Sequence, residues 1–140
     1  MRLSTKSRYG LRALCALALL SREGAPVSLT RIAQRENISR QYLSLIFQKL
    51  RECGFVEAVR GVRGGFRLAR NPSEITVGSV VNCLDGPVAP VDCLAVKQCS
   101  RQNACVARGA WEHLKQRIEL ALEEITIECL IKGKNGDYTG

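Results

Sequence analysis

The sequence predicts a mainly α-helical fold with one small β-hairpin, and three observations support this prediction. Several apolar stripes recur at helical spacing, most of them preceded by a serine or threonine that can cap a helix. Two short segments flank a glycine-rich turn within residues 55–70 and are typical of a hairpin. A longer helical stripe then runs from about residue 105 to residue 130. The 140 residues allow one domain with its own core, or a small domain plus an interaction element.

The first predicted helix opens at Ser4 and ends before the breaker Gly24-Ala25-Pro26. Its apolar stripe, which we expect to face the core, consists of Tyr9, Leu11, Leu14, Leu17, Ala18 and Leu20. Ser28 then caps a short helix that ends at about Arg35. After a turn, Ser39 caps a third helix, so that two short helices joined tightly predict a helix-turn-helix.

The third predicted helix, residues 40–53, has two distinct faces. Its apolar side chains fall within an arc of about 140°, and they are Tyr42, Leu43, Ile46, Phe47 and Leu50. Its polar side chains fall within about 100° on the other side, and they are Arg40, Gln41, Ser44 and Gln48, with Ser39 just before them. Glutamine can pair with adenine and arginine with guanine, which favours contact with a DNA major groove. An ordinary amphipathic surface helix also has a polar face, so that alternative stays open at this point.

The predicted hairpin, with strands at residues 55–60 and 66–70, is strongly basic. It contains no acidic residue from position 60 onward, and its arginines there are Arg60, Arg63, Arg67 and Arg70. Glycines in the turn at residues 61–65 allow a close approach to a phosphate backbone or a minor groove. A helix-turn-helix followed by a basic hairpin predicts a winged helix, in which Arg60, Arg63 and Arg67 contact DNA.

Charge is divided unequally between the two halves of the chain. Residues 1–70 carry 14 Lys or Arg against 4 Asp or Glu, whereas residues 71–140 carry 7 against 9. The first half therefore has a net charge of +10 and the second half −2. This asymmetry indicates that the first half faces a polyanion, although a solvated basic surface would have the same composition.

Three cysteines, Cys93, Cys99 and Cys105, recur at six-residue intervals between two helical patterns. On one helix, thiols six residues apart would differ by about 600° and could not converge, so we expect them to lie on a loop. Thiolates are the usual ligands of iron–sulfur clusters. Structural zinc fits less well, because it prefers four ligands with close cysteine pairs, and reversible disulfide formation also stays open. The remaining cysteines lie among apolar helical positions, where we expect small core side chains and a spare ligand only at Cys83; they are Cys15, Cys53, Cys83 and Cys129.

The last helical pattern, which follows a short helix at residues 76–84 and the cysteine segment, carries an apolar stripe. The stripe consists of Trp111, Leu114, Ile118, Leu122 and Ile125. A helix of about 25 residues would be about 37 Å long, too long for a small domain to cover, so we expect a second subunit to pack on it. The alternative is that it folds back on the first helix. The predicted units are residues 1–84 (winged helix), 85–106 (cysteine loop), 107–132 (dimerisation helix) and 133–140 (tail).

Other classes of protein fit the sequence poorly. The longest apolar run, residues 13–20, is far shorter than the approximately 20 residues of a membrane-spanning helix. No glycine-rich nucleotide loop or carboxylate pair at catalytic spacing is present, and the single histidine is His113. We therefore expect a cytoplasmic protein that is not an enzyme and does not bind membranes.

Four segments together resemble the IscR/NsrR/CymR-type winged-helix transcription regulators. They are residues 1–10 (MRLSTKSRYG), residues 39–50, the wing motif at residues 59–66 and the three cysteines. The resemblance implies a homodimer on a palindromic double-stranded operator, with the long C-terminal helices crossing at the dimer interface. In the IscR and NsrR branches, it further implies that the cysteine loop holds an iron–sulfur cluster that controls DNA binding.

The sequence departs from that family's patterns at several positions. The histidine that follows the third cysteine in 2Fe-2S members is replaced by Arg108, and the acidic residue of 4Fe-4S members is replaced by Arg8. Cluster type and fourth ligand are therefore open. Ser44 stands where the family often has glutamate. Residues 86–91 resemble the CymR branch, which binds no cluster and responds to sulfur metabolism through a partner enzyme; this alternative ranks second because that branch lacks the three cysteines.

Overall fold

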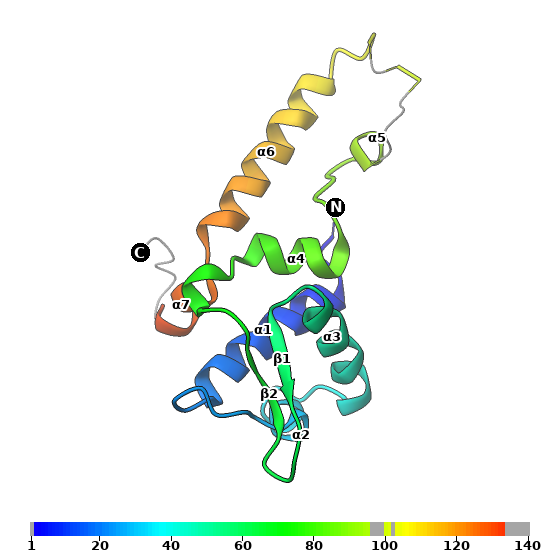
Figure 1. The fold of residues 1–140 in the computed structure, drawn as a ribbon. Coiled ribbons are helices and arrows are strands. Elements are labelled where there is room, and N and C mark those ends of the chain that lie inside the picture. The colour runs from blue at the N-terminus through cyan, green and yellow to red at the C-terminus, as the bar shows by residue number, and fades with distance from the viewer. Residues whose placement is uncertain (1, 96–99, 102, 134–140) are drawn as a thin grey trace.

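The computed structural model describes residues 2–95, 100, 101 and 103–133 (Figure 1). Its elements in chain order are α1 (Thr5–Leu20), α2 (Leu29–Glu36), α3 (Arg40–Glu52), β1 (Val56–Val59), β2 (Gly65–Leu68), the 3₁₀ turn η1 (Pro72–Glu74), α4 (Val77–Asp85), α5 (Asp92–Ala95), α6 (Arg108–Glu124) and α7 (Ile127–Lys132). Helices α1 to α3 and the hairpin form the lower body in Figure 1, and α6 projects from it beyond α4. The predicted fold, mainly helical with one hairpin, is confirmed.

Hydroxyl side chains cap helices α1 to α4, at the three serines that the sequence predicts and also at Thr76. Each accepts a hydrogen bond from the backbone N–H three residues later, and the capping residues are Ser4, Ser28, Ser39 and Thr76. The turn between α2 and α3 is made by Asn37, which has the left-handed conformation with φ 54° and ψ 49°. Asparagine tolerates this conformation, so the two helices of the helix-turn-helix join within a few residues.

The core lies where α1, α2 and α3 meet α4 and the hairpin. Phe47 of α3 packs edge-on against Phe66 of β2, with ring centroids 4.9 Å apart. Gly10 allows α1 to approach α4 closely, because a Cβ atom at this position would overlap the side chain of Leu84. The winged-helix body is therefore held together by side chains from all of these elements.

The two strands form an antiparallel wing, with Val56 opposite Leu68 and Val59 opposite Gly65. A further backbone bridge joins the wing to the segment before α2, because Val27 and Phe66 exchange N–H···O bonds of 2.8 Å. This bridge fixes the direction of the wing relative to the helix-turn-helix.

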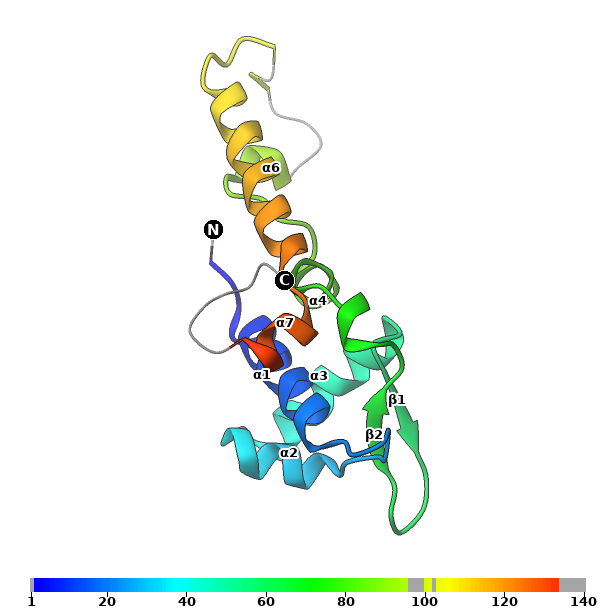
Figure 2. The same cartoon turned by 90° about the vertical axis from the view of Figure 1, so that its left-hand side faces the viewer.

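The prediction of one continuous helix from about residue 105 to residue 130 is wrong. Helix α6 ends at Glu124, the next residue Ile125 is extended, and Thr126 caps the separate helix α7. Helix α7 packs on α1 through the fully buried Ile127, so the last part of the chain returns to the body. Figure 2 shows α7 beside α1, with α6 directed away from both. The fold-back alternative therefore holds for the last segment, α7, whereas packing of a second subunit on α6 stays a prediction.

Candidate nucleic-acid interface and metal centre

Helix α3 presents a polar face to solvent. All of its predicted DNA-contacting side chains are exposed, and they are Ser39, Arg40, Gln41, Ser44 and Gln48. The opposite face is buried through Leu43, Ile46, Phe47 and Leu50. Arg40 donates a hydrogen bond of 3.0 Å from Nε to the Thr30 hydroxyl of α2, which restrains the start of the exposed face. The separation of faces predicted from the sequence is therefore confirmed, whereas contact with bases stays a prediction.

Leu45 is a surface residue of α3 that the sequence analysis did not single out. Its side chain is 65% exposed although it is apolar. On a helical wheel it lies about 40° from Gln41 and outside the buried arc, which is the signal that could have identified it. Because leucine can contact a thymine methyl group, Leu45 adds an apolar group to the candidate reading face.

The four wing arginines divide into two pairs with different surroundings. Arg60 and Arg63 are exposed, and within the described part of the chain neither forms an ion pair. Arg67 pairs with the carboxylate of Glu57 across the strands. Arg70 lies over the Phe55 ring at 5.1 Å and donates to the Cys53 carbonyl oxygen at 3.5 Å. Two arginines are thus available to an external anion, while Arg70 has a structural contact at the base of the wing.

The cysteine segment connects α4 to α6 and is described in part. Cys93 lies in the short helix α5, so the prediction that all three thiols come from non-helical backbone is wrong for this residue. Cys105 does lie outside a helix, and its N–H donates to the Arg101 carbonyl at 2.8 Å. Cys99 falls outside the described residues. Cys93 and Cys105 are half-buried, so small molecules can reach them.

Among the described residues, no group of three cysteine, histidine or acidic side chains lies close enough to hold a metal ion. Cys93 and Cys105 nevertheless fit an iron–sulfur cluster chemically, because both are free thiols on the one segment that also contains Cys99. Arg108 is engaged by the Glu112 carboxylate at 2.8 Å, and the exposed His113 follows one residue later on α6.

Two cysteines expected to be separate core side chains are joined. Cys53, at the C-terminal end of α3, forms a disulfide with Cys83 of α4. Both pack against the core, as expected, but the role of Cys83 as a spare ligand is wrong for this structure because its sulfur is already bonded. Because the two cysteines are 30 residues apart, no local sequence pattern indicates this pairing.

Cys15 of α1 is a free thiol. Burial raises the pKa of this thiol to about 11, with a further contribution from the charge of Glu36.

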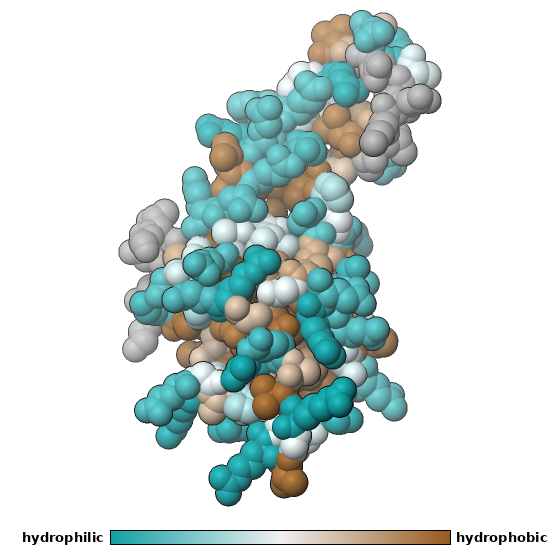
Figure 3. Space-filling view, in the orientation of Figure 1, coloured by the Kyte–Doolittle hydropathy of each residue, from teal (hydrophilic) through white to brown (hydrophobic). Residues whose placement is uncertain are grey.

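The predicted dimerisation stripe is largely uncovered on α6, which has no fully buried side chain. Trp111 is 37% exposed and Leu114 is 42% exposed, and Ile118 and Leu122 are half-buried. Figure 3 shows hydrophobic side chains in brown among hydrophilic ones in teal along this projecting arm. An apolar stripe of this kind is suited to packing on another helix.

Comparison with known proteins identifies a family of transcriptional regulators that matches most of this chain. Residues 3–133 match the model of the Rrf2 family, described as an iron-dependent transcriptional regulator. The IscR transcriptional regulators of Pectobacterium atrosepticum and Serratia proteamaculans are 39% and 38% identical, over 96% of this chain and 81% and 82% of theirs.

The solved structures similar to this chain include regulators of the CymR and IscR types. CymR, the global cysteine regulator of B. subtilis, has a TM-score of 0.79 and 32% identity, over 96% of this chain and 99% of that one. IscR of T. potens has a TM-score of 0.76 and 37% identity, over 94% and 87%. No helix in the described ranges is both long and apolar enough to cross a membrane. The chain therefore belongs to the Rrf2 family, and it is a DNA-binding transcriptional regulator of the IscR type.

Proposed function

We propose that this regulator acts in the cytoplasm as a homodimer on a palindromic operator, under the control of an iron–sulfur cluster. The DNA contacts in this proposal come from two places. The exposed face of α3 reads base edges in the major groove, and the wing contacts phosphates or the minor groove. The residues assigned to DNA are Ser39, Arg40, Gln41, Ser44, Gln48, Arg60, Arg63 and Arg67.

The dimer contact is assigned to α6. Trp111 and Leu114 of its apolar stripe are exposed and the rest of the stripe is half-buried, and a second copy of the same stripe would cover it in a symmetric pair. The residues assigned to this contact are Trp111, Leu114, Ile118, Leu122 and Ile125. In such a dimer, two α3 helices would lie about one DNA turn apart, or about 34 Å, as a palindromic site requires.

The cluster is assigned to Cys93, Cys99 and Cys105, and the observation that carries this assignment is their position on the connection between α4 and α6. When bound, an iron–sulfur cluster would supply an iron centre whose properties depend on its ligands and on solvent access, so that it could respond to iron supply, oxygen or nitric oxide. Helix α4 packs on α1 and α3, and the base of α6 packs on α4. A conformational change in the connection between α4 and α6, caused by binding or loss of the cluster, would therefore be transmitted through α4 to the DNA-contacting helix α3.

The fourth ligand lies outside this cysteine trio. Arg8 and Arg108 cannot ligate iron because guanidinium groups stay protonated. The exposed imidazole of His113, a group of the partner subunit, or a small thiol or water is left for that position. An iron without a thiolate from its own segment would be the most reactive one.

Anaerobic reconstitution tests this proposal. Iron and sulfide are measured in wild type and in Cys93→Ser, Cys99→Ser and Cys105→Ser, with Cys15→Ser as the control, since that thiol lies in the helical body. We expect the three variants to lose iron and sulfide together and to change operator affinity, and the control to retain both. Retention of the cluster in all three variants would contradict the assignment.

The similarity to CymR favours one alternative, a cluster-free regulator of sulfur metabolism that acts through a partner enzyme or thiol oxidation. Colour separates the two proposals, because a thiolate-bound cluster absorbs visible light. Protein purified without oxygen that is colourless, holds no sulfide and binds its operator unchanged by iron and sulfide would favour the alternative.

A further inference from the structure

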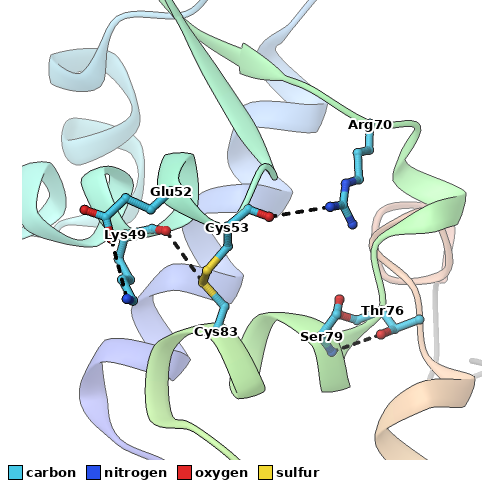
Figure 4. Close-up of a disulfide and its surroundings, with 7 residues drawn as sticks. All are labelled: Lys49, Glu52, Cys53, Arg70, Thr76, Ser79 and Cys83. Atoms are coloured by element: carbon cyan, nitrogen blue, oxygen red, sulfur yellow. Dashed lines mark hydrogen bonds and ion pairs between the residues drawn. A yellow bond between two sulfur atoms is a disulfide. The ribbon is translucent and has the colours of Figure 1, made fainter.

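The disulfide between Cys53 and Cys83 joins the C-terminal end of α3, the proposed DNA-recognition helix, to α4 (Figure 4). Cys53 is the C-terminal cap of α3, and Cys83 lies in the last turn of α4. Their Cα atoms are 6.3 Å apart, within the range of about 4.4–6.8 Å that a disulfide requires. The two helix ends are therefore positioned to form the bond without backbone rearrangement.

The surroundings make Cys53 a junction of three elements. The Cys83 sulfur lies 3.6 Å from the Lys49 carbonyl oxygen in the last turn of α3. The Cys53 carbonyl accepts a hydrogen bond from Arg70, which follows β2 at the base of the wing. Figure 4 shows both contacts around the disulfide. A bond at this point restrains α3 and the wing base together against α4.

We propose that Cys53 and Cys83 form a reversible thiol/disulfide site that responds to small thiols and disulfides and sets how firmly α3 is held on α4. DNA lies in reducing compartments, where disulfides are usually transient and regulatory. Both cysteines are half-buried, so a small reagent has access to them. The site is separate from Cys93, Cys99 and Cys105, and it rests on DNA binding by this family but not on the cluster.

The redox step is balanced by a low-molecular-weight disulfide as oxidant. One cysteine thiolate attacks this disulfide, forms a mixed disulfide and releases one small thiolate. The second cysteine thiolate then attacks the protein sulfur of the mixed disulfide and releases the other small thiolate. Two protein thiols are oxidised, one small disulfide is reduced to two thiols, and the two protons end on the released thiols.

The consequence for DNA binding follows from the position of the bond. In the oxidised structure, the polar face of α3 is exposed and the C-terminal end of this helix is fixed to α4. Less conformational entropy is then lost when α3 binds DNA. In the reduced protein, the end of α3 can move relative to α4. We therefore expect the oxidised form to bind DNA about tenfold more tightly, a coupling of ordinary size.

The test uses the full chain with Cys93→Ser, Cys99→Ser and Cys105→Ser combined, so that loss of a cluster cannot produce the result. The protein is oxidised with glutathione disulfide or reduced with dithiothreitol, and the cross-link is mapped by alkylation and mass spectrometry. Affinity is measured on a duplex of about 30 base pairs, selected from random sequences by the oxidised wild type. Amide exchange of residues 49–53 gives a readout that does not depend on DNA.

The expected result is a cross-link confined to Cys53 and Cys83 that dithiothreitol reverses, with slower exchange and about tenfold tighter binding in the oxidised form. Adding Cys53→Ser should remove all three differences, whereas adding Cys15→Ser should leave them. A cross-link between other cysteines, or none, would overturn the proposal. So would equal exchange rates or equal affinities of the oxidised and reduced forms. Failure of the cluster assignment would leave this result unchanged.

Discussion

The backbone N–H of Val77 donates a hydrogen bond of 2.8 Å to the carbonyl oxygen of Ile125, joining the first residue of α4 to the residue after α6. A second bond of 2.9 Å runs from the N–H of Ile127 to the carbonyl of Ile75. Close by, the Thr76 hydroxyl donates to the Glu123 carboxylate at 3.0 Å. The base of α6 is therefore fixed to α4, and the rest of the helix extends from this attachment.

Replacing Leu114 by glutamate should dissociate the proposed dimer without unfolding the subunit. The side chain is 42% exposed within one subunit, so a carboxylate is tolerated there, but it would be desolvated against a second α6. We expect a loss of about 3 kcal/mol in association, or more than 100-fold in the dimer dissociation constant. Sedimentation equilibrium measures this constant. Leu120→Glu is the matched control, because Leu120 is 55% exposed on the opposite side of α6; equal dimers in both variants would contradict the assignment of the stripe.

Arg60→Ala should weaken DNA binding and lower its salt dependence. Arg60 is exposed on the wing, so a phosphate contact there would release one counterion. We expect the slope of log affinity against log salt concentration to fall by about 1 in the variant. Arg67→Ala should change the slope less, because the charge of Arg67 is already paired with Glu57. Fluorescence anisotropy at several salt concentrations gives both slopes, and an unchanged slope for Arg60→Ala would exclude this contact.

The link between Ser4 and Asp85 should make a small, pH-dependent contribution to stability. Burial raises the pKa of Asp85, but hydrogen bonds from the Ser4 hydroxyl and N–H outweigh it, so the pKa lies below its ordinary value. The contribution is therefore present above the unfolded pKa of about 3.9 and is lost as pH falls through the lower folded pKa.

Asp85→Asn measures this contribution. Because Asp85 is exposed, we expect the variant to lose less than about 1 kcal/mol in the free energy of unfolding near neutral pH. Urea unfolding of both proteins should show this difference at about pH 7 and a smaller one at about pH 3. A difference that stays constant over this range would show that Asp85 acts through packing rather than through its charge.

Cys129 should react with iodoacetamide faster than Cys15. The Thr126 hydroxyl donates a hydrogen bond to the Cys129 sulfur at 3.1 Å and lowers the pKa of that thiol. Burial raises the pKa of Cys15 from 9.0 to about 11, so its thiolate fraction is about 100-fold below that of an ordinary thiol. Peptide mass spectrometry of the reduced protein at increasing times gives the two rates. Thr126→Val should slow Cys129, whereas Thr126→Ser, which keeps the hydroxyl, should not.

Reduction of the disulfide should lower the free energy of unfolding by about 3 kcal/mol. The bond closes a loop between residues 30 positions apart, and opening it restores conformational freedom to the unfolded chain. Urea unfolding with and without dithiothreitol measures the loss. Cys83→Ser should have the lower stability in both conditions, and a wild type that does not respond to dithiothreitol would contradict this prediction.

Much of the winged helix is predictable from local sequence. Ser4, Ser28 and Ser39 cap their helices by bonds within the next three residues, so each start is encoded next to the helix itself. The wing follows from alternating segments around a glycine-rich turn. The exposed and buried faces of α3 follow from residue spacing alone, because both sides of that helix are strongly marked.

The features that the sequence analysis missed depend on contacts between distant segments. The apolar period continues through Ile125, and the helix ends there because the chain bonds to Val77 of α4 instead. The pairing of Cys53 with Cys83 likewise requires α3 and α4 to be packed first. Arg67 has the charge expected of a DNA contact, but its pairing with Glu57 appears only once the strand register is known. Helix periodicity carries no information on any of these three contacts.

Among the described residues, α6 is bonded to the body at its C-terminal end, so that it can pivot about this end as a lever does. Its 17 residues span about 25 Å from the fixed base to the far end, where the cysteine segment ends. A rotation of about 5° at the base would therefore move the far end by about 2 Å. Gly78 lies against the Glu123 side chain at this base, where any larger residue would overlap it. A substitution at position 78 would therefore displace the Glu123 carboxylate and, with it, the hydrogen bond from Thr76 that helps to hold the base of the arm.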